Sequence, residues 1–419
     1  MPCADPGGSL DRLDFAALIK PGDLIVCGQG PAEPTALTGR LMQQRAALGG
    51  VRAFIGFSWS QTPDPEYTDH VSFSSYCGSA NNRRLGDRLE ILPVHYSMLA
   101  GALGAQAPVL LLQLAAGDDA HSFSFGAAQE YLTDLLPRAR LVIAEVNAQA
   151  PRTRGARIAR AAIDVLVPTD YAPAHLPPPV FGAVECSIAE RVAALIEDGA
   201  TLQFGLGAIP GAVAAALLQH RRLGIHSGLI GDDVLALAQS GALTNECKTL
   251  DHGVTVTGML AGGPALLQWS HDNAGLALRP TSYTHAHENL AGQHRFCAVN
   301  SAIEVDLSGQ INTEVAAGRY LGAVGGAIDF LRGAAASRGG LPIVALPSTA
   351  GGTSRIVAKL SGPVSTSRAD AALIVTEHGV ADLRGLSIRR RRDHLIAIAA
   401  PAYRERLDRS DLSEYLGKG

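Results

Sequence analysis

Two stretches of the chain repeat one pattern, and this repeat constrains the fold more than any other feature of the sequence. GDLIVCGQGPAEPTALTGRL begins at Gly22 and GATLQFGLGAIPGAVAAALL begins at Gly199. Each contains a glycine, a short apolar run, a G-x-G motif, a proline (Pro34 or Pro210) and a helical pattern. A strand, a glycine turn and a helix in this order are typical of parallel α/β sheets. The repeat predicts two similar open α/β domains; chance similarity is the alternative, because such units are common.

Further short apolar runs and one proline-rich segment extend this interpretation to the whole chain. The segment 172–180, APAHLPPPV, cannot continue a helix or a central strand, so it predicts the linker between the two halves. We therefore expect domains at residues 1–178 and 179–419. The predicted strands are Asp23–Cys27, Val109–Leu114, Leu141–Glu145, Thr201–Phe204, Ile343–Leu346 and Ala372–Val375.

Composition excludes several classes of protein. Hydrophobic residues make up 47% of the chain and charged residues 18%, which favours a buried globular enzyme over disorder. The net charge of −4 gives no global positive field for nucleic acid or an anionic membrane. The six cysteines include no C-x-x-C pair, so we expect no zinc site, no redox dithiol and no metal. No apolar run approaches ~18 residues and no signal-peptide pattern is present, so we expect a cytoplasmic protein without membrane or nucleic-acid partners.

A glycine loop in the second repeat is the first candidate binding site. Glycines between a strand and a helix let backbone amides approach a ligand, and the start of a helix favours negative charge. A pyrophosphate, a carboxylate or an oxyanion would each suit the loop. A dinucleotide site is not indicated, because Pro210 replaces the third glycine and no acid follows ~20 residues later. A tight turn without a ligand is the alternative. The loop consists of Gly205, Leu206, Gly207, Ala208 and Ile209.

A second glycine-rich stretch, GRYLGAVGGAIDF, spans residues 318–330. It is consistent with a strand-to-helix loop with exposed amides, or with a packed turn.

Seven segments, in this order and spacing, resemble the acetyl-CoA hydrolase/CoA-transferase family, especially its 4-hydroxybutyrate and butyrate CoA-transferase branch. The resemblance runs from about residue 20 to about residue 410, and seven motifs in order are highly specific. The segments are AEVNAQAPRTRG (144–155), DGATLQFGLGAIPGAV (198–213), LGIHSGLIGD (223–232), VNSAIEVDLSGQIN (299–312), GAVGGAIDFLRGA (322–334), ALPSTAGGTSRIV (345–357) and VTEHGVADLRG (375–385).

The resemblance implies two similar domains of the NagB/RpiA-like CoA-transferase fold that face each other across a cleft. It implies an acyl-CoA and a small carboxylic acid as partners, with the CoA thioester as substrate and no other cofactor. It also implies a homo-oligomer. In this family a glutamate attacks the thioester, and acyl-glutamyl anhydride and glutamyl-CoA intermediates follow. Backbone amides stabilise the oxyanions.

Residues that match the family's motifs are the expected ligand contacts. They are the loop from Gly205 to Ile209, Asn300 in the N-x-x-x-E-V-D stretch, and Gly325 and Gly326 in the G-x-x-G-G loop. Ala327 stands where the family usually has a glutamine, so one polar contact is expected to be missing.

The chain departs from the family at the catalytic position. The family's glutamate lies in a G-I-H-T-E-M segment, which here reads Gly-Ile-His-Ser-Gly-Leu over residues 224–229. Gly228 therefore replaces the glutamate, and no anhydride or thioester can form on its side chain.

Three hypotheses follow from this departure. In the first, another carboxylate takes over; Glu314 is the leading candidate, with Glu145, Glu246 and Glu377 as further possibilities. In the second, water enters the space at Gly228 and His226 acts as general base, which would make the protein a thioesterase. In the third, the chain binds acyl-CoA without turnover or serves as a partner subunit. We expect an enzyme of CoA transfer between small acids, with hydrolysis and non-catalytic binding as the alternatives.

Overall fold

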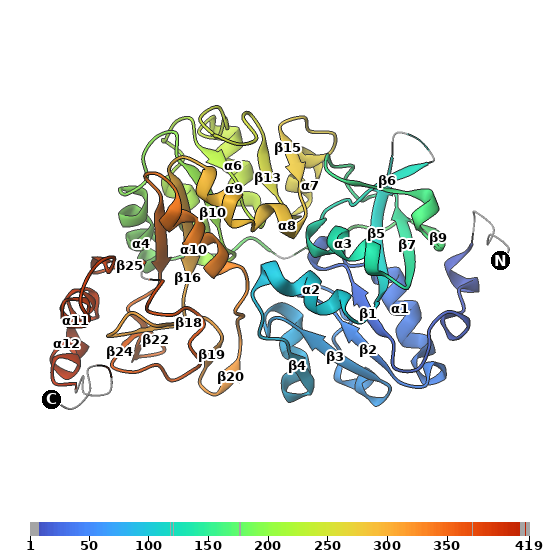
Figure 1. Cartoon of the computed structure of the whole chain (residues 1–419), viewed down its shortest axis with the longest axis horizontal. Coiled ribbons are helices and arrows are strands. Elements are labelled where there is room, and N and C mark those ends of the chain that lie inside the picture. The colour runs from blue at the N-terminus through green and yellow to red at the C-terminus, as the bar shows by residue number, and fades with distance from the viewer. Residues whose placement is uncertain are drawn as a thin grey trace. The chain divides into compact units, whose positions relative to one another are not determined.

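The computed structural model describes residues 8–117, 119, 121–175, 177–370, 372–410 and 415. The chain forms two compact units (Figure 1). Unit 1 comprises Met1–Pro178, Gly228–Asp232 and Val256–Thr284, and unit 2 comprises Pro179–Ser227, Asp233–Thr255 and His285–Gly419. The predicted domain division between residues 178 and 179 stays a prediction, because compactness alone does not show that a unit folds as a domain.

A parallel sheet forms the centre of unit 1. Ile25 in its middle strand lies opposite Ala53 on one side and Val109 on the other. Both faces of this strand are buried, which explains its uninterrupted apolar sequence. The parallel strands, in spatial order, are β4 (Leu89–Ile91), β3 (Val71–Ser75), β2 (Val51–Phe54), β1 (Leu24–Cys27), β5 (Val109–Ala116), β7 (Leu141–Asn147) and β9 (Val165–Thr169).

Shorter elements complete unit 1. An antiparallel extension of β5 contains β6 (Ser122–Ser124) and β8 (Arg157–Ala159). The helices are α1 (Thr35–Gln44), α2 (Leu99–Gly104), α3 (Glu130–Leu135), α7 (Pro264–Ser270) and α8 (Thr281–Thr284). The remaining strands are β12 (Leu229–Ile230), β14 (Met259–Leu260) and β15 (Leu276–Leu278). Short 3-10 helices cover Leu10–Arg12, Phe15–Ala17, Gly30–Ala32, Arg45–Leu48, Pro65–Asp69, Ala80–Arg88, Tyr96–Met98, Leu136–Arg138 and Arg160–Ala162.

Helix α1 shows how the sequence pattern builds the core of unit 1. Its buried apolar residues include Leu37, Leu41 and Met42, which recur at helical spacing. Leu37 and Leu41 belong to the same buried cluster as Ile25 of β1 and Ile143 of β7. The apolar side of α1 therefore covers the sheet.

Unit 2 contains a second parallel sheet. Its strand order is β11 (Gly224–Ile225), β10 (Thr201–Phe204), β16 (Phe296–Ser301), β21 (Leu341–Ala345), β25 (Leu373–Thr376) and β26 (Gly379–Asp382), and all pairs except β25–β26 are parallel. The helices are α4 (Ala183–Ala193), α5 (Ala208–Ala216), α9 (His287–Gly292), α10 (Ala327–Ala336), α11 (Ile388–Ile398) and α12 (Pro401–Asp408). Phe296, Phe330 and Leu331 belong to a buried cluster that joins α10 to the sheet.

Small two- and three-stranded sheets supplement unit 2. They contain β17 (Glu304–Asp306), β18 (Ile311–Asn312), β19 (Val315–Ala316), β20 (Arg319–Tyr320), β22 (Thr349–Ala350), β23 (Thr353–Ser354) and β24 (Ile356–Val357). Two elements pass from one unit to the other along the chain: α6 (Asp232–Ser240) and β13 (Thr255–Thr257).

The expected fold class is confirmed: the chain is an α/β protein with mainly parallel sheets. The two repeated stretches hold equivalent positions, because β1 and β10 are both interior strands with a parallel neighbour on each side. They differ in the turn that follows. A 3-10 helix at Gly30–Ala32 precedes α1, whereas β10 reaches α5 directly through Gly205–Gly207.

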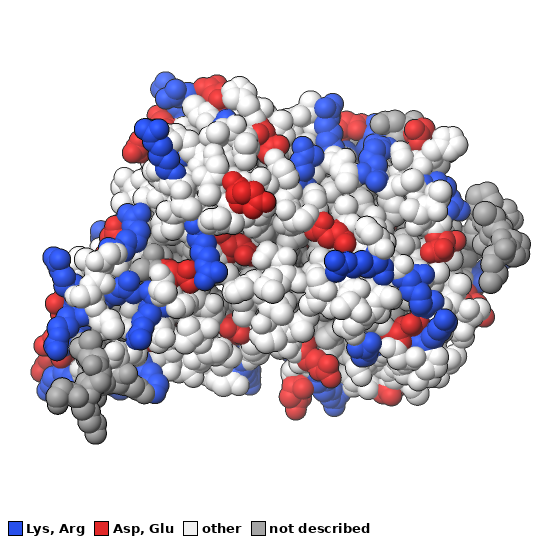
Figure 2. Space-filling model, viewed as in Figure 1, with Lys and Arg blue, Asp and Glu red and all other residues white. Residues whose placement is uncertain are grey.

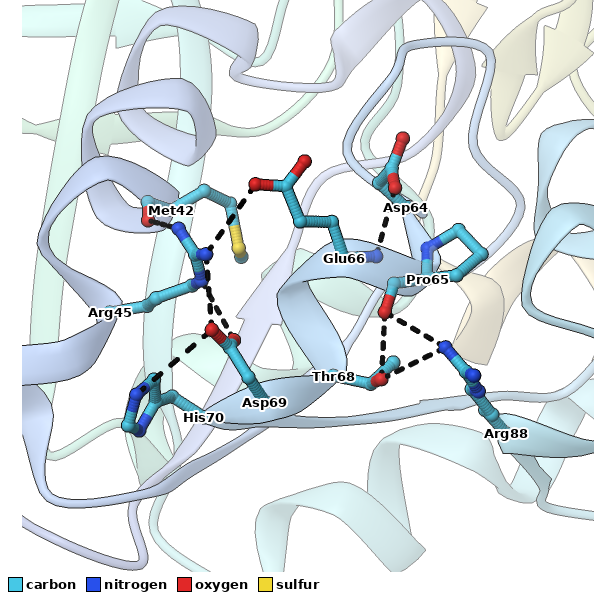
Figure 3. Close-up of polar contacts among 9 residues, drawn as sticks. All are labelled: Met42, Arg45, Asp64, Pro65, Glu66, Thr68, Asp69, His70 and Arg88. Carbon is cyan, nitrogen blue, oxygen red and sulfur yellow. Dashed lines mark hydrogen bonds and ion pairs between the residues drawn. The ribbon is translucent and has the colours of Figure 1, made fainter.

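Polar contacts fasten the surface loop that precedes β3 (Figure 3). The Arg45 guanidinium donates to both carboxylate oxygens of Asp69 at 2.8 and 3.1 Å, and to the Met42 carbonyl at 3.0 Å. This ion pair lowers the pKa of Asp69. Arg88 donates to the Pro65 carbonyl at 3.0 Å on the other side of the loop. The loop is therefore held at both ends by arginines.

Charges of both signs are interspersed on the face drawn in Figure 2. Basic side chains gather where Figure 1 places α11 and α12. Arg391 of α11 donates to the carbonyls of Ser308 and Arg368, and Arg392 pairs with Asp408 at 2.7 Å. These two arginines of α11 thus fasten the C-terminal helices of unit 2. In the ranges that the structure describes, no helix has the length and apolarity needed to cross a bilayer.

Val299 provides a test of core packing in unit 2. It is fully buried in β16, so Val299→Ala removes two buried methyl groups and is expected to lower the free energy of unfolding by about 2 kcal/mol. The urea concentration at the midpoint of unfolding measures the loss. Val180→Ala is the matched control, because Val180 is 92% exposed. Equal midpoints for the two variants would contradict the assigned packing.

Candidate functional site

The glycine loop of unit 2 lies at the carboxyl edge of the parallel sheet. Strands β10 and β16 are neighbours, with Phe204 opposite Val299, so the residues that follow them emerge side by side. A Cβ added at Gly205 would lie 3.7 Å from the Asn300 Oδ1 atom. The structure thus brings together the loop and Asn300, which are 95 residues apart in the sequence.

The backbone of this loop requires glycine at Gly207. Its φ is +123° and its ψ is −175°, a conformation that L side chains rarely adopt. It immediately precedes α5, and no side chain caps the first turn of this nine-residue helix. Leu206 is 45% exposed, whereas Ile209 is buried. Uncapped amides at a helix start favour an anionic or oxyanionic group.

Gln203 positions Asn300, a contact that sequence reasoning missed. The Asn300 amide nitrogen donates to the Gln203 Oε1 atom at 2.9 Å, and Gln203 Nε2 donates to Asn300 Oδ1 at 3.3 Å. Both side chains are buried. The sequence could have indicated this contact, because Gln203 is a polar residue between the apolar residues of β10.

The second glycine stretch has a packed geometry. A Cβ at Gly322 would lie 1.9 Å from the Thr313 carbonyl oxygen, and one at Gly326 would lie 2.5 Å from the His285 Nε2 atom. Gly325 has a φ of +58°, and Ala327 begins α10 directly after the loop. Three of these glycines are therefore explained by close packing or by backbone conformation. Their role in ligand binding stays a prediction.

A surface pocket of about 390 Å³ lies against this stretch in unit 2. It is lined by residues that follow β16 and β21, by Gly322 and by one basic residue, Arg355. A guanidinium at the rim of a largely apolar pocket can hold a carboxylate or a phosphate. The lining residues are Ser301, Ala302, Ile303, Thr313, Ala316, Leu321, Gly322, Pro347, Ala350 and Arg355.

Glu314, the leading candidate of the first hypothesis, is buried and follows Thr313, which lines this pocket. Its carboxylate accepts hydrogen bonds from the Tyr320 hydroxyl at 2.8 Å and from the Ser365 hydroxyl at 2.7 Å. Its carbonyl accepts the backbone amides of Leu321 and Gly322. These contacts give Glu314 a structural role in the loop, and its catalytic role stays a prediction.

His226 is fully buried in unit 2, directly after β11. Its ring lies edge-on to Phe296, with the ring centroids 6.3 Å apart. Its Nδ1 atom lies 3.5 Å from the Gln293 amide nitrogen. The ring is thus held between core residues, and its role as a general base stays a prediction.

Gly228 belongs to unit 1, where its backbone pairs with a second glycine. The Gly258 amide donates to the Gly228 carbonyl at 3.1 Å, and the Gln129 amide donates to the Gly258 carbonyl at 2.9 Å. The buried Glu130 follows Gln129, and burial raises the pKa of its carboxyl to about 7. Sequence reasoning missed Glu130, because an acid at the start of a short helix carries no signal of burial.

Of the remaining candidate carboxylates, Glu246 is exposed, and Glu145 and Glu377 have local partners. Glu145 accepts from the Leu37 amide at 3.2 Å and from the Tyr171 hydroxyl, and Glu377 accepts from the Ser348 amide at 2.8 Å. Among the residues that the structure describes, no group of three or more His, Cys, Asp or Glu side chains is placed to hold a metal ion.

Comparisons with known proteins identify the class of protein. The acetyl-CoA hydrolase/transferase C-terminal domain matches residues 262–410. The 4-hydroxybutyrate coenzyme A transferase of Clostridium kluyveri is 40% identical over 304 residues, which cover 71% of each chain. The succinyl-CoA:cyclohexane-1-carboxylate CoA transferase of Geobacter metallireducens is 31% identical over 407 residues, 94% of this chain and 93% of that protein. The crystal structure of RipA from Yersinia pestis is similar with a TM-score of 0.88, at 29% identity over 93% of each chain.

The chain therefore belongs to the acetyl-CoA hydrolase/transferase family. This result confirms the resemblance carried by the seven segments, and it confirms an enzyme family of CoA transfer and CoA-thioester hydrolysis.

His285, which packs against Gly326, provides a pH test. Burial, with a smaller contribution from His226, lowers its pKa to about 3, so the folded protein keeps this ring neutral. The unfolded chain binds one more proton between pH ~6.5 and ~3, and stability is lost as the pH falls through this range. Between pH 6.5 and pH 5 the free energy of unfolding should therefore fall by about 2 kcal/mol less in His285→Gln than in the wild type. Denaturation at both pH values measures it, with the exposed His294→Gln as control. An unchanged pH dependence in His285→Gln would contradict the assignment.

Proposed function

We propose that the protein transfers CoA between small carboxylic acids, with an acyl-CoA thioester as substrate and no further cofactor. The observation that supports this most is the uncapped glycine loop at the start of α5, with Asn300 beside it. Backbone amides in this arrangement are suited to the CoA portion of a thioester or to the oxyanion formed when its carbonyl is attacked. The relatives named above are CoA transferases, which supports the same reaction.

Two features of unit 2 suit the two parts of the substrate. The loop from Gly205 to Ile209 presents amides without a side-chain cap. The pocket that contains Arg355 combines a cation with apolar walls, as a short-chain carboxylate requires. Asn300, held by Gln203, would orient the bound group by a hydrogen bond. We place this reaction in the cytoplasm and in a homo-oligomer, on the strength of the family resemblance.

A second candidate function, hydrolysis of the thioester by water, is favoured by Gly228. The position has no side chain, so it supplies no carboxylate to conserve the thioester energy. Water attack would release a free acid and CoA.

One experiment separates these functions. The protein is incubated with acetyl-, butyryl- or succinyl-CoA, with and without an acceptor acid. A new acyl-CoA that appears only with the acceptor supports transfer, and free thiol without an acceptor supports hydrolysis. Calorimetric binding of CoA without turnover would instead support a non-catalytic homologue and contradict both reactions.

Gly228→Glu tests whether the rest of the site remains family-like. A glutamate at this position restores the side chain that the family uses, so transferase activity is expected to rise at least about tenfold. The rate of acyl-CoA formation with acetate as acceptor measures the effect. Gly228→Gln is the control, because it adds similar bulk without a nucleophilic carboxylate. Equal rates in the two folded variants would contradict the prediction.

Gly207→Ala tests the glycine loop. The conformation at Gly207 is strained for any side chain, so the loop amides should move and CoA affinity should fall about tenfold. Calorimetric titration with CoA gives the dissociation constant. Gly241→Ala is the matched control, since Gly241 also has a positive φ, +81°, and open space around its Cβ position. A similar loss of affinity in both variants would indicate general destabilisation.

A further inference from the structure

Unit 1 holds a buried carboxylate beside the position where the expected glutamate is missing. We propose that Glu130 is the nucleophilic carboxylate of this enzyme, acting in place of the side chain that Gly228 lacks. The inference rests on the proposed CoA transfer, which requires a carboxylate that can carry first the acyl group and then CoA.

Three backbone segments lie side by side here, with Gly258 between the segment of Glu130 and that of Gly228. Strands β12 and β14 are parallel neighbours, and the Gly258 amide before β14 donates to the Gly228 carbonyl at 3.1 Å. On the other side of Gly258, its carbonyl accepts the Gln129 amide at 2.9 Å, and Ala128 forms a bridge with Met259. Gly258 therefore separates the segment of Glu130 from that of Gly228 by the width of one strand.

Close packing explains the absence of a side chain at Gly258. A Cβ added there would lie 2.7 Å from the Gly228 carbonyl oxygen and 3.3 Å from the Glu130 Cγ atom. The side chain of Glu130 thus lies over the glycine that pairs with Gly228.

Two side chains orient the carboxylate of Glu130. The Tyr96 hydroxyl donates to Oε1 at 2.7 Å, and the Gln29 amide nitrogen donates to Oε2 at 2.6 Å. Gln29 also donates to the Tyr96 hydroxyl at 2.8 Å, which closes a ring of three residues. The Phe57 amide and the Tyr76 hydroxyl donate to Gln29 Oε1 in turn. The carboxylate is therefore held in one orientation, while each oxygen keeps a second lone pair.

The backbone at Glu130 is strained. Its φ is +39°, which is unusual for a residue other than glycine and costs of order 1–3 kcal/mol. Burial raises the pKa of its carboxyl to about 7, so a substantial fraction is ionised at neutral pH. A desolvated carboxylate on a strained backbone lowers the stability of the folded state. Such groups are typical of functional sites.

Unsatisfied donors flank Glu130 on both sides in the sequence. The Tyr131 hydroxyl and the Gln129 Nε2 atom are buried, and neither has a hydrogen-bond partner among the described residues. The Tyr131 hydroxyl lies on the same side as Gln29, since a Cβ added at Gly56 would lie 2.9 Å from it and 2.3 Å from Gln29 Oε1. An oxygen of a bound substrate would satisfy such donors, which otherwise cost about 1–3 kcal/mol each.

Two other buried carboxylates, Glu33 and Glu304, have more hydrogen-bond donors than Glu130, whereas the Glu314 carboxylate likewise accepts from two hydroxyls. Glu33 accepts from the Ser58 and Ser60 hydroxyls and from backbone amides of the same loop. Glu304 accepts from the Ser361 amide at 2.6 Å and the Gly362 amide at 3.1 Å, besides side-chain donors. Both carboxylates fasten loops. The Glu130 carboxylate instead accepts from the side chains of Gln29 and Tyr96.

The reaction proceeds in balanced steps. A Glu130 oxygen bonds to the thioester carbonyl carbon, the C–S bond breaks, and CoA leaves as thiolate. The thiolate then attacks the Glu130 Cδ atom of the anhydride, so the first acid leaves as carboxylate and a glutamyl-CoA thioester remains. A second carboxylate reverses the two steps, which regenerates the Glu130 carboxylate and yields the new acyl-CoA. No oxidant, reductant or metal is consumed.

Trapping identifies the nucleophile. The full chain is incubated with acetyl-CoA, reduced with borohydride and digested, and the peptides are analysed by mass spectrometry. We expect the peptide that contains Glu130 to carry the reduced glutamyl group, and Glu130→Gln to lose both this label and at least about 100-fold in transfer rate. CoA binding by calorimetry should remain within about threefold, because glutamine keeps the shape of the side chain.

The pH profile and a rescue variant provide independent readouts. The titratable groups that face Glu130 are the hydroxyls of Tyr76, Tyr96 and Tyr131, whose own pKa values burial raises well above the usual value. The transfer rate should therefore rise with pH through about 7, as the Glu130 carboxyl ionises. The double variant Glu130→Gln with Gly228→Glu should recover transfer, and its rate should lose this rise near pH 7.

Glu145→Gln is the matched control. Glu145 is buried, has a pKa raised to about 7 and bonds the α1 backbone, so its loss should lower stability without abolishing the label. A label on Glu314 or another residue, unlabelled turnover, or full activity in Glu130→Gln would overturn the proposal while leaving CoA chemistry intact. Failure of the wild type to bind or convert any acyl-CoA would instead overturn the proposed function.

Discussion

Parallel pairing of buried strands is the constraint on which the rest of each unit depends. In such a sheet every carboxyl end lies at the same edge, so residues far apart in the sequence emerge next to one another. Gly205 and Asn300 meet because β10 and β16 are neighbours in register. The polar pair of Gln203 and Asn300 is tolerated inside this apolar sheet because each side chain satisfies the other.

Close approach of backbone segments is the second constraint. The physical reason that a position requires glycine differs from one position to another. At Gly207 the conformation itself excludes a side chain. At Gly258 and Gly326 the neighbouring atoms exclude it, since a Cβ would meet the Gly228 carbonyl or the His285 ring. Both Gly207 and Gly326 precede a helix whose first turn has no side-chain cap, so the two positions differ in backbone conformation and not in capping.

The hydrogen-bond donors around each buried carboxylate distinguish a structural role from a chemical role in this chain. A charge removed from water must be compensated by hydrogen bonds or its pKa rises. Glu33 and Glu304 accept hydrogen bonds from several donors in the loops that they fasten, and burial still raises the pKa of Glu33. Glu130 has two side-chain donors and a raised pKa, which leaves it more reactive than a fully compensated group.

The sequence by itself determined the α/β class, the strand–glycine–helix repeats and the family, and it predicts that Gly228 stands at the family's glutamate position. These features depend on residues that are close together in the sequence or on the order of motifs. The spacing of apolar residues, the residues of turns and the order of the motifs can all be read from the sequence. Tertiary structure alone decided that Gln203 orients Asn300, that Glu314 and His226 are enclosed by local partners, and that Gly258 lies between the segments of Glu130 and Gly228. Such contacts depend on which distant segments become neighbours in the fold and on how far each polar group is buried from water. No local residue pattern specifies either of these.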